Sequence, residues 1–431
     1  MRFALIGYPL GHSMSKTIHE TVFAWHGLDA TYAFEPMAVL DERAMERLKA
    51  KYDGWNVTIP HKQKIIPYLD GLDDSAIRYG AVNTVLNRNG QLIGYNTDAW
   101  GFVYGLRRQG LSLADKRILL LGAGGAAGVA AGVAAKDAGE VHILSRTQSR
   151  ARALANRWPE HVRAVERPEG PYDGIINTTP AGMWPRTHDC AVIDELIAGA
   201  GFVYDCIYNP VVTPLVLKAR AAGKVGFSGV DMLIGQAIRA QQIWLGGTTD
   251  RVDELRAQLL TSLKRDFPLP TVLIGFMGCG KSTVGKILAE KLGCASVDLD
   301  AQIETQGMPI PDIFRLYGEE EFRRRECETL AEALRSGGVI AAGGGLVTWE
   351  ESRRLLRENA CRVIYLDTPF EEAYARIRGT DRPKIRHADA EQVRALYEAR
   401  IPLYQAAADA TVTSGATPED TAARIADMLR D

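Results

Sequence analysis

The segment GFMGCGKST, residues 275–283, constrains the fold more than any other stretch of this 431-residue chain. It fits the pattern G-x-x-x-x-G-K-[ST], follows the strand-like run TVLIGF and opens the helix-like run STVGKILAEKLG. Glycines at these positions let backbone amides curl around an anion at a helix N-terminus. The segment therefore predicts a phosphate-binding loop between a buried strand and a helix, as found in α/β domains.

Within this loop, Lys281 is expected to neutralise nucleotide phosphates, and the hydroxyl of Ser282 is expected to ligate Mg²⁺. The residues predicted to bind the nucleotide are Gly278, Cys279, Gly280, Lys281, Ser282 and Thr283. A glycine turn without function is the alternative, and the strand and helix around the loop argue against it.

A second glycine loop, LGAGGAAG (121–128), follows the apolar run RILLL and opens an alanine-rich stretch. Its G-x-G-x-x-[GA] spacing is a weak signal alone, but the strand before it and the helix after it favour a dinucleotide site. An NAD site is expected to have an acidic residue at the end of the next strand, VHILSRT. Arg146 stands there instead, and a guanidinium favours the 2′-phosphate of NADP(H). A surface arginine without function is the alternative.

The composition fits a soluble globular protein, with 46% apolar and 24% charged residues. A net charge of −2 gives little support to a nucleic-acid or membrane role. The uncharged run 118–135 imitates a membrane span, but a glycine-rich break divides it into a strand and a helix. Six cysteines without a CxxC pair indicate reduced thiols, and no secretory leader is expected at the N-terminus. We therefore expect a cytoplasmic protein.

The alternation of short apolar runs with helical stretches predicts α/β domains with mostly parallel sheets. The expected division is a substrate-binding domain (1–100 and 231–248), a Rossmann-like NADP domain (101–230), a helical linker (249–269) and a P-loop domain with a parallel sheet (270–431). The linker is predicted because leucines recur at helical spacing between 251 and 267, before the segment PLP (268–270).

After the phosphate-binding loop, short motifs follow in a characteristic order: SVDLD (296–300), GEEEFRRRE (318–326), VIAAGGG (339–345), DRP (381–383) and YEARIPLY (397–404). Each has a plain structural alternative, such as a solvated acid or a charged helix face. Their order and spacing resemble the shikimate kinase family over residues 270–431.

The resemblance to shikimate kinases implies roles for six residues. Asp300 would act as base on the substrate hydroxyl, Arg323 and Arg400 would hold the substrate carboxylate, Gly344 would approach the ring, Asp298 would lie near the metal, and Arg382 would be a lid arginine. Glu326, one helical turn after Arg323, would hold that arginine.

The segment NVTIPHK (56–62) ends a strand-like run with a proline and places Lys62 directly after it. Short polar residues follow other strand-like runs in GHSMSKTIH (11–19), GAVNTV (80–85), GYNTDAWG (94–101) and GVDMLIGQ (229–236). These motifs resemble the shikimate dehydrogenase family over residues 1 to about 248. A histidine such as His61 is expected only to pack against the turn or cap it.

The resemblance to shikimate dehydrogenases makes Lys62 the catalytic lysine and Asp98 its partner. The implied substrate contacts are Ser13, Ser15, Thr58, Asn83, Asp98, Tyr208 and Gln236. The implied cofactor contacts are Gly122, Ala123, Gly124, Gly125, Ala126, Ser145, Arg146, Thr147 and Gly229.

Together the two resemblances imply NADPH-dependent reduction of 3-dehydroshikimate to shikimate, then phosphorylation of shikimate by ATP with Mg²⁺, in aromatic amino-acid synthesis. One alternative is an NAD-dependent quinate/shikimate dehydrogenase. A second is a regulator that senses a metabolite with inactive domains, and a third replaces the second activity by another small-metabolite kinase, such as a gluconate kinase. Small molecules are the expected partners, and the oligomeric state stays open.

Overall fold

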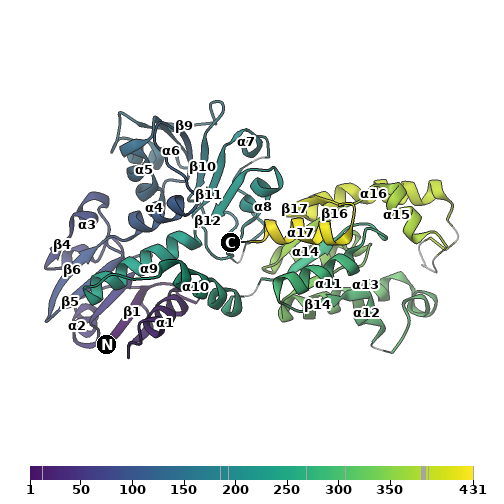
Figure 1. The fold of residues 1–431 in the computed structure, drawn as a ribbon, viewed down its shortest axis with the longest axis horizontal. Helices are drawn as coiled ribbons and strands as arrows, with labels where there is room; N and C mark the ends of the chain where they lie inside the picture. The colour runs from purple at the N-terminus through teal and green to yellow at the C-terminus, as the bar shows by residue number, and fades with distance from the viewer. Residues whose placement is uncertain are drawn as a thin grey trace. The chain divides into compact units, whose positions relative to one another are not determined.

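The computed structural model describes residues 1–11, 13–184, 186–192, 194–267, 269–305, 307–379, 385–386 and 388–430. The chain divides into two compact units (Figure 1). The first comprises Met1–Pro180, Gly199–Val211 and Phe227–Phe267, and the second comprises Ala181–Ala198, Val212–Gly226 and Pro268–Asp431.

The first sheet is mixed and has the strand order β2-β1-β3-β5-β6-β4. Its strands are β1 (Arg2–Gly7), β2 (Thr31–Pro36), β3 (Gly54–Val57), β4 (Gly71–Leu72), β5 (Thr84–Arg88) and β6 (Gln91–Tyr95). Its helices are α1 (Ser15–Trp25), α2 (Glu42–Lys51), the 3₁₀ turn η1 (Ile66–Tyr68) and α3 (Asp74–Tyr79). The central strands β1 and β3 are parallel to each other and almost wholly buried, as expected of strands covered on both faces.

The second sheet has the order β12-β11-β10-β7-β8-β9, and its described pairings are parallel. Its strands are β7 (Arg117–Leu121), β8 (Glu140–Leu144), β9 (Val162–Val165), β10 (Gly174–Asn177), β11 (Phe202–Asp205) and β12 (Val225–Ser228). The helices between its strands in sequence are α5 (Gly125–Asp137), α6 (Gln148–Ala155), α7 (Asp194–Gly199) and α8 (Pro214–Ala221). Of these, α8 and all but the last residue of α7 fall in segments grouped with the second unit. The order reverses between β7 and β10, which is the dinucleotide-binding position of a Rossmann fold. The predicted Rossmann-like fold is confirmed, with the glycine loop directly after β7.

Three further helices belong to the first unit: α4 (Asp98–Arg108), α9 (Val230–Leu245) and α10 (Val252–Asp266). Helix α4 packs on α9, and α10 packs on α1 (Figure 1). In α10 the side chains of Leu255, Leu259 and Leu263 are fully buried, so their helical spacing reflects a face packed within this unit.

The third sheet lies in the second unit and is wholly parallel, with the order β14-β15-β13-β16-β17. Its strands are β13 (Thr271–Ile274), β14 (Ser296–Asp298), β15 (Val339–Ala341), β16 (Arg362–Asp367) and β17 (Ala410–Thr413). Its helices are α11 (Lys281–Leu292), α12 (Leu299–Glu304), α13 (Ile310–Ser336), the 3₁₀ turn η2 (Leu346–Thr348), α14 (Glu350–Glu358), α15 (Phe370–Ile377), α16 (Ala390–Ala407) and α17 (Pro418–Met428). The parallel sheet predicted for this region is confirmed. Of the helices in the described ranges, none has the length and apolar character that a membrane span needs.

Candidate active sites

Lys62 lies on a short turn after β3, and backbone hydrogen bonds fix this turn on both sides. The Thr58 amide donates to the Ile6 carbonyl at 2.9 Å, and the Val82 amide donates to the Lys62 carbonyl at 2.8 Å. His61 is fully buried, with Nε2 2.7 Å from the Met37 carbonyl, so the prediction that it packs against the turn is confirmed. The turn therefore holds the backbone of Lys62 while its long side chain reaches outward.

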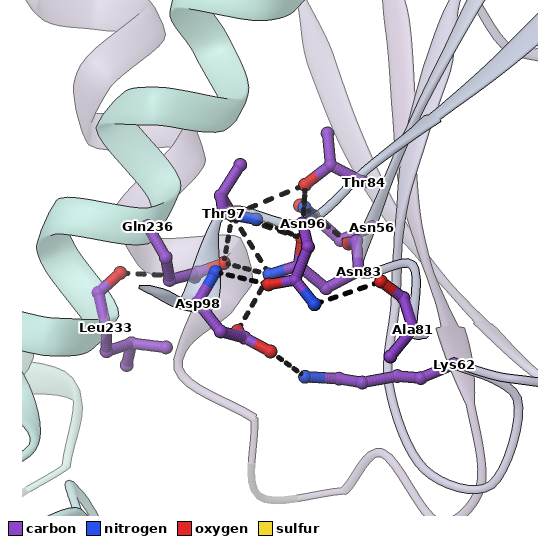
Figure 2. A network of polar contacts seen from close by, with 10 residues as sticks. All are labelled: Asn56, Lys62, Ala81, Asn83, Thr84, Asn96, Thr97, Asp98, Leu233 and Gln236. Atoms are coloured by element: carbon purple, nitrogen blue, oxygen red, sulfur yellow. Dashed lines mark hydrogen bonds and ion pairs between the residues drawn. The ribbon is translucent and has the colours of Figure 1, made fainter. Parts of the chain in front are cut away.

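The ammonium of Lys62 pairs with a carboxylate on the first turn of α4 (Figure 2). Its Nζ lies 2.5 Å from Asp98 Oδ2, and the two side chains are 30% and 15% exposed. The pair is thus shielded from bulk water yet open to a ligand. The other oxygen, Asp98 Oδ1, accepts a hydrogen bond of 2.7 Å from Asn83 Nδ2.

The structure gathers several of the predicted substrate contacts near this pair. Asn83 is buried just before β5, and Gln236 on α9 places its Oε1 3.4 Å from Asn83 Nδ2. Ser13 and Ser15 are joined by a hydrogen bond of 3.1 Å between their hydroxyls. Burial raises the pKa of the Tyr208 phenol, and the negative charge of Asp98 raises it further, which places this ring in the field of the same carboxylate. Thr58 lies on the same turn as Lys62, at the end of β3.

The glycine loop after β7 has the geometry of a close ligand approach. Gly122 has a φ of 102°, and a Cβ there would lie 2.7 Å from Thr178 Oγ1. Gly124 and Gly125 are exposed at the N-terminus of α5, which leaves backbone amides open to an anion. Ala123 and Ala126, their neighbours, are partly exposed.

The polar residues after β8 include no carboxylate. Ser145 accepts from the Thr147 amide at 3.3 Å, while the side chain of Arg146 is exposed. Gly229 begins α9 where a Cβ would lie 2.2 Å from the Cys206 carbonyl oxygen, so only glycine fits between these segments. The site is suited to a dinucleotide that carries a 2′-phosphate.

The second unit contains the predicted phosphate-binding loop between β13 and α11. Gly278 and Gly280 have φ angles of 83° and 92°, and a Cβ at Gly278 would lie 2.4 Å from the Ala373 carbonyl oxygen. Lys281 is buried and donates to the carbonyls of Gly275 at 2.8 Å and Phe276 at 2.9 Å. The ammonium of Lys281 thus lies over the loop, where it would neutralise the charge of bound phosphates.

Oxygen donors that suit Mg²⁺ follow two strands of this sheet. Ser282 and Thr283 are exposed on the first turn of α11, and Asp298 ends β14, where its side chain caps α12 by accepting from the Ala301 amide at 3.1 Å. Cys279 is buried in the loop with its sulfur 3.5 Å from Lys281 Nζ.

Two arginines and two acids converge on the glycines after β15. Arg323 forms an ion pair with the fully buried Glu326, and a Cβ at Gly345 would lie 2.1 Å from Arg323 Nη2. Arg400 donates from Nη1 to the Gly344 carbonyl at 2.9 Å. Asp300 lies close by, because its Oδ1 would be 2.9 Å from a Cβ at position 343.

These arginines keep unused donors. Among the described residues, the buried Nε atoms of Arg323 and Arg400 have no hydrogen-bond partner. Guanidinium donors of this kind suit a small carboxylate ligand. The predicted lid arginine, Arg382, lies outside the described residues.

Some residues of both sites escaped the sequence interpretation. In the first unit these are the buried polar residues Asn56, Thr84, Asn96 and Thr97 around Asn83. In the second unit, Tyr404 donates to the Gly344 carbonyl beside Arg400. All five lie within motifs quoted from the sequence, namely NVTIPHK, GAVNTV, GYNTDAWG and YEARIPLY. For the four residues of the first unit, a run of short polar side chains near a strand end was therefore the signal.

Comparisons with known proteins identify related families for both parts of the chain. The family model "Shikimate dehydrogenase substrate binding domain" matches residues 5–85, and the model "Shikimate kinase" matches residues 277–430. The NADP⁺-dependent shikimate dehydrogenase of Caldanaerobacter subterraneus subsp. tengcongensis is 38% identical over 260 residues, which is 58% of this chain and 93% of that protein.

Two solved structures are similar to the first part of the chain. A shikimate dehydrogenase in complex with NADP⁺ has 34% identity and a TM-score of 0.55, covering 60% of this chain and 94% of that one. The shikimate 5-dehydrogenase of Thermus thermophilus, in complex with NADP(H) and shikimate, has 30% identity and a TM-score of 0.54, covering 61% of this chain and 100% of that one. The chain therefore belongs to the shikimate dehydrogenase family, and in residues 277–430 it carries a domain of the shikimate kinase family.

Proposed function

We propose that this chain carries out two consecutive reactions of the shikimate pathway: NADPH-dependent reduction of 3-dehydroshikimate, then ATP-dependent phosphorylation of shikimate. For the reduction, the observation that carries the proposal is the partly exposed Lys62–Asp98 pair at 2.5 Å. For the phosphorylation, it is the pair of unused arginine Nε donors near Asp300, together with the glycine loop at Lys281.

In the dehydrogenase site, Lys62 donates a proton to the ketone oxygen of the substrate, and Asp98 holds the ammonium in place. When bound, NADPH supplies the hydride. The polar side chains of Ser13, Ser15, Thr58, Asn83, Tyr208 and Gln236 bind the hydroxyls and carboxylate of the ring. The protein backbone at residues 122–126 and at Gly229 would lie against the cofactor. Its 2′-phosphate would be bound by Ser145, Arg146 and Thr147.

In the kinase site, Arg323 and Arg400 hold the substrate carboxylate, and Gly344 lets the ring approach the backbone. Asp300 accepts the proton of the reacting hydroxyl, while Lys281 neutralises phosphate charge. Residues 278–283 would hold ATP, and Ser282 and Asp298 would hold Mg²⁺. Arg382, which lies outside the described residues, would contact the transferred phosphoryl group, as the family resemblance implies. ATP supplies the phosphoryl group when bound.

The experiment supplies 3-dehydroshikimate, NADPH, ATP and Mg²⁺ to the purified chain. We expect NADPH oxidation together with the appearance of a phosphorylated ring acid. Faster turnover with NADH would favour the NAD-dependent alternative, and phosphorylation of gluconate in preference to shikimate would favour the other kinase. Absence of any turnover would favour a sensing role.

The domain division and location are proposals too. We propose a substrate domain of 1–100 and 231–248, an NADP domain of 101–230, a helical segment at 249–269 and a kinase domain of 270–431. A cytoplasmic location is supported by the six cysteines, none of which forms a disulfide.

A further inference from the structure

A chain of buried side-chain hydrogen bonds lies behind the Lys62–Asp98 pair (Figure 2). It runs from Tyr32 on β2 through Asn56 on β3 and Thr84 on β5 to Asn83, which contacts Asp98. These four side chains are between 0% and 5% exposed, so water cannot replace a lost partner.

The orientation of the Asn56 amide is set by the backbone. Its Nδ2 lies 3.2 Å from the carbonyl oxygen of Asn83, which can only accept, so this side of the amide must be the NH₂ group. Its Oδ1 therefore faces the Tyr32 hydroxyl, which donates to it at 2.7 Å. The NH₂ group also donates to Thr84 Oγ1 at 3.1 Å.

The orientation of the Asn83 amide is set in the same way. Its Oδ1 lies 2.8 Å from the backbone amide of Thr97, which can only donate, so Oδ1 must be the acceptor. The Nδ2 group then donates to Thr97 Oγ1 at 2.9 Å and to Asp98 Oδ1 at 2.7 Å. Because Asp98 Oδ1 accepts from Asn83, the other carboxylate oxygen, Asp98 Oδ2, faces Lys62.

Thr84 connects the two amides. Because its hydroxyl accepts from Asn56, its own proton is free to go to Asn83 Oδ1, 3.0 Å away. The hydrogen bonds therefore all point in one direction, from Tyr32 to the carboxylate of Asp98. Hydrogen bonds aligned in this way polarise one another and hold the last member firmly.

We propose that Thr84 and Asn56 are positioning residues of the dehydrogenase site. Through Asn83 they hold the carboxylate of Asp98 in the orientation in which it pairs with Lys62. Neither residue needs to touch the substrate or the cofactor for this role. The inference rests on the proposed reduction of 3-dehydroshikimate.

The decisive variant is Thr84→Val, which keeps the branched shape and removes the hydroxyl. We expect kcat for 3-dehydroshikimate reduction to fall about tenfold, the equivalent of about 1.4 kcal/mol in the transition state, with the KM for NADPH unchanged. Thr84→Ser restores the hydroxyl and should recover most of the rate. A Thr84→Ser variant as slow as Thr84→Val would overturn the proposal, because the hydroxyl would then not be the cause.

Asn87 on the same strand provides a matched control. Its side chain donates to the carbonyls of Lys49 and Tyr52, both at 2.8 Å, and these groups are not members of the chain described above. Asn87→Ala should lower the thermal midpoint while kcat at 25 °C stays within about twofold of the parent. An equal loss of kcat in Asn87→Ala would mean that general loosening of the sheet explains both results.

Tyr32→Phe tests the proposal if Thr84→Val does not fold, since it removes one oxygen at the far end of the chain. We expect a smaller loss of kcat, about threefold, with NADPH binding intact. If Thr84→Val folds and its kcat is unchanged, the inference is contradicted. If only Tyr32→Phe can be tested, an unchanged kcat in that variant contradicts it. Absence of reduction by the parent chain would instead contradict the proposed function.

Discussion

The two lysines proposed for the two sites have different partners, which suit the different tasks proposed for them. Lys62 faces the carboxylate of Asp98, an oppositely charged partner that orients the ammonium proposed to donate a proton. Lys281 donates to the carbonyls of Gly275 and Phe276, neutral groups that arriving phosphates can replace. A proton donor needs a fixed neighbour, whereas a phosphate ligand needs a neighbour that can be displaced.

Replacement of Lys62 by alanine tests its role directly. Because Lys62→Ala removes the acid–base group and leaves the ring contacts, we expect kcat for reduction to fall about 10²–10⁴-fold while substrate binding largely survives. Steady-state kinetics with NADPH measure this, and the kinase rate of the same preparation is the control. Near-normal reduction by this variant would remove Lys62 from the mechanism.

Glu326 predicts a pH dependence of stability in the second unit. Burial raises the pKa of its carboxyl from the usual 4.5 to about 7, although the charge of Arg323 acts against this rise. The folded state therefore binds the proton of Glu326 more tightly than the unfolded state does. The stability that this proton contributes is complete below about pH 4.5 and is lost as the pH rises through about 7.

The variant Glu326→Gln removes this titration. We expect the thermal midpoint of the parent, relative to the variant, to decrease as the pH rises from about 4.5 to about 7. Thermal melts of both proteins across this range measure the difference. A difference that stays constant, or increases with pH, would contradict the assignment.

At the scale of elements, three of the predicted binding segments are glycine-rich turns that follow parallel strands, namely those after β7, β13 and β15. In the turn after β15, hydrogen atoms occupy the space that β-carbons would fill at positions 343 and 345, beside Asp300, Glu326 and Arg323. These glycines are therefore required by close approach and not by backbone conformation.

Gly345→Ala should disturb this turn selectively. The new Cβ would lie 2.1 Å from Arg323 Nη2, so the guanidinium must move. It would then leave the position in which it is proposed to bind the carboxylate of shikimate. Hydrogen bonds to charged groups contribute about 1.5–3 kcal/mol, so we expect the KM for shikimate to rise about 10- to 100-fold while the KM for ATP changes little. The control is Gly285→Ala in α11, where the nearest atom would lie at an ordinary 3.6 Å.

Helix α10 makes a second prediction at this scale. Leu259 is fully buried in it, and removal of such a leucine side chain costs about 2–5 kcal/mol. Leu259→Ala should lower the temperature at which dehydrogenase activity is lost and leave that of kinase activity unchanged. Equal losses of the two activities, or no loss, would contradict the assignment of α10 to the first unit.

For the whole molecule, two proposed sites built from different residues predict separable activities. Lys281→Ala should lower phosphorylation about 10²–10³-fold and leave reduction unchanged, because among the described residues its ammonium donates to groups of its own loop. With all substrates supplied, shikimate should accumulate in step with NADPH oxidation while little ADP forms. A parallel loss of NADPH oxidation would show that the two reactions depend on each other.

Local features of the fold can be read directly from the amino-acid order. Contiguous residues encode each glycine loop together with the strand before it and the helix after it, because an anion-binding turn needs glycine at fixed spacing. Lys62 and Asp98 could be paired in advance through the family resemblance of their motifs, and they lie 2.5 Å apart. Fully buried His61 was likewise predicted to pack.

Only the tertiary structure decided which distant groups meet. Leucine spacing predicted a helix over most of α10 but not that α1 would cover its buried face. The hydrogen bonds from Tyr32 to Asn83 join three strands, and their direction depends on the backbone groups beside each amide. Periodicity shows that a face is buried, whereas the partner of that face depends on strand order and on hydrogen-bond donors far away in the sequence.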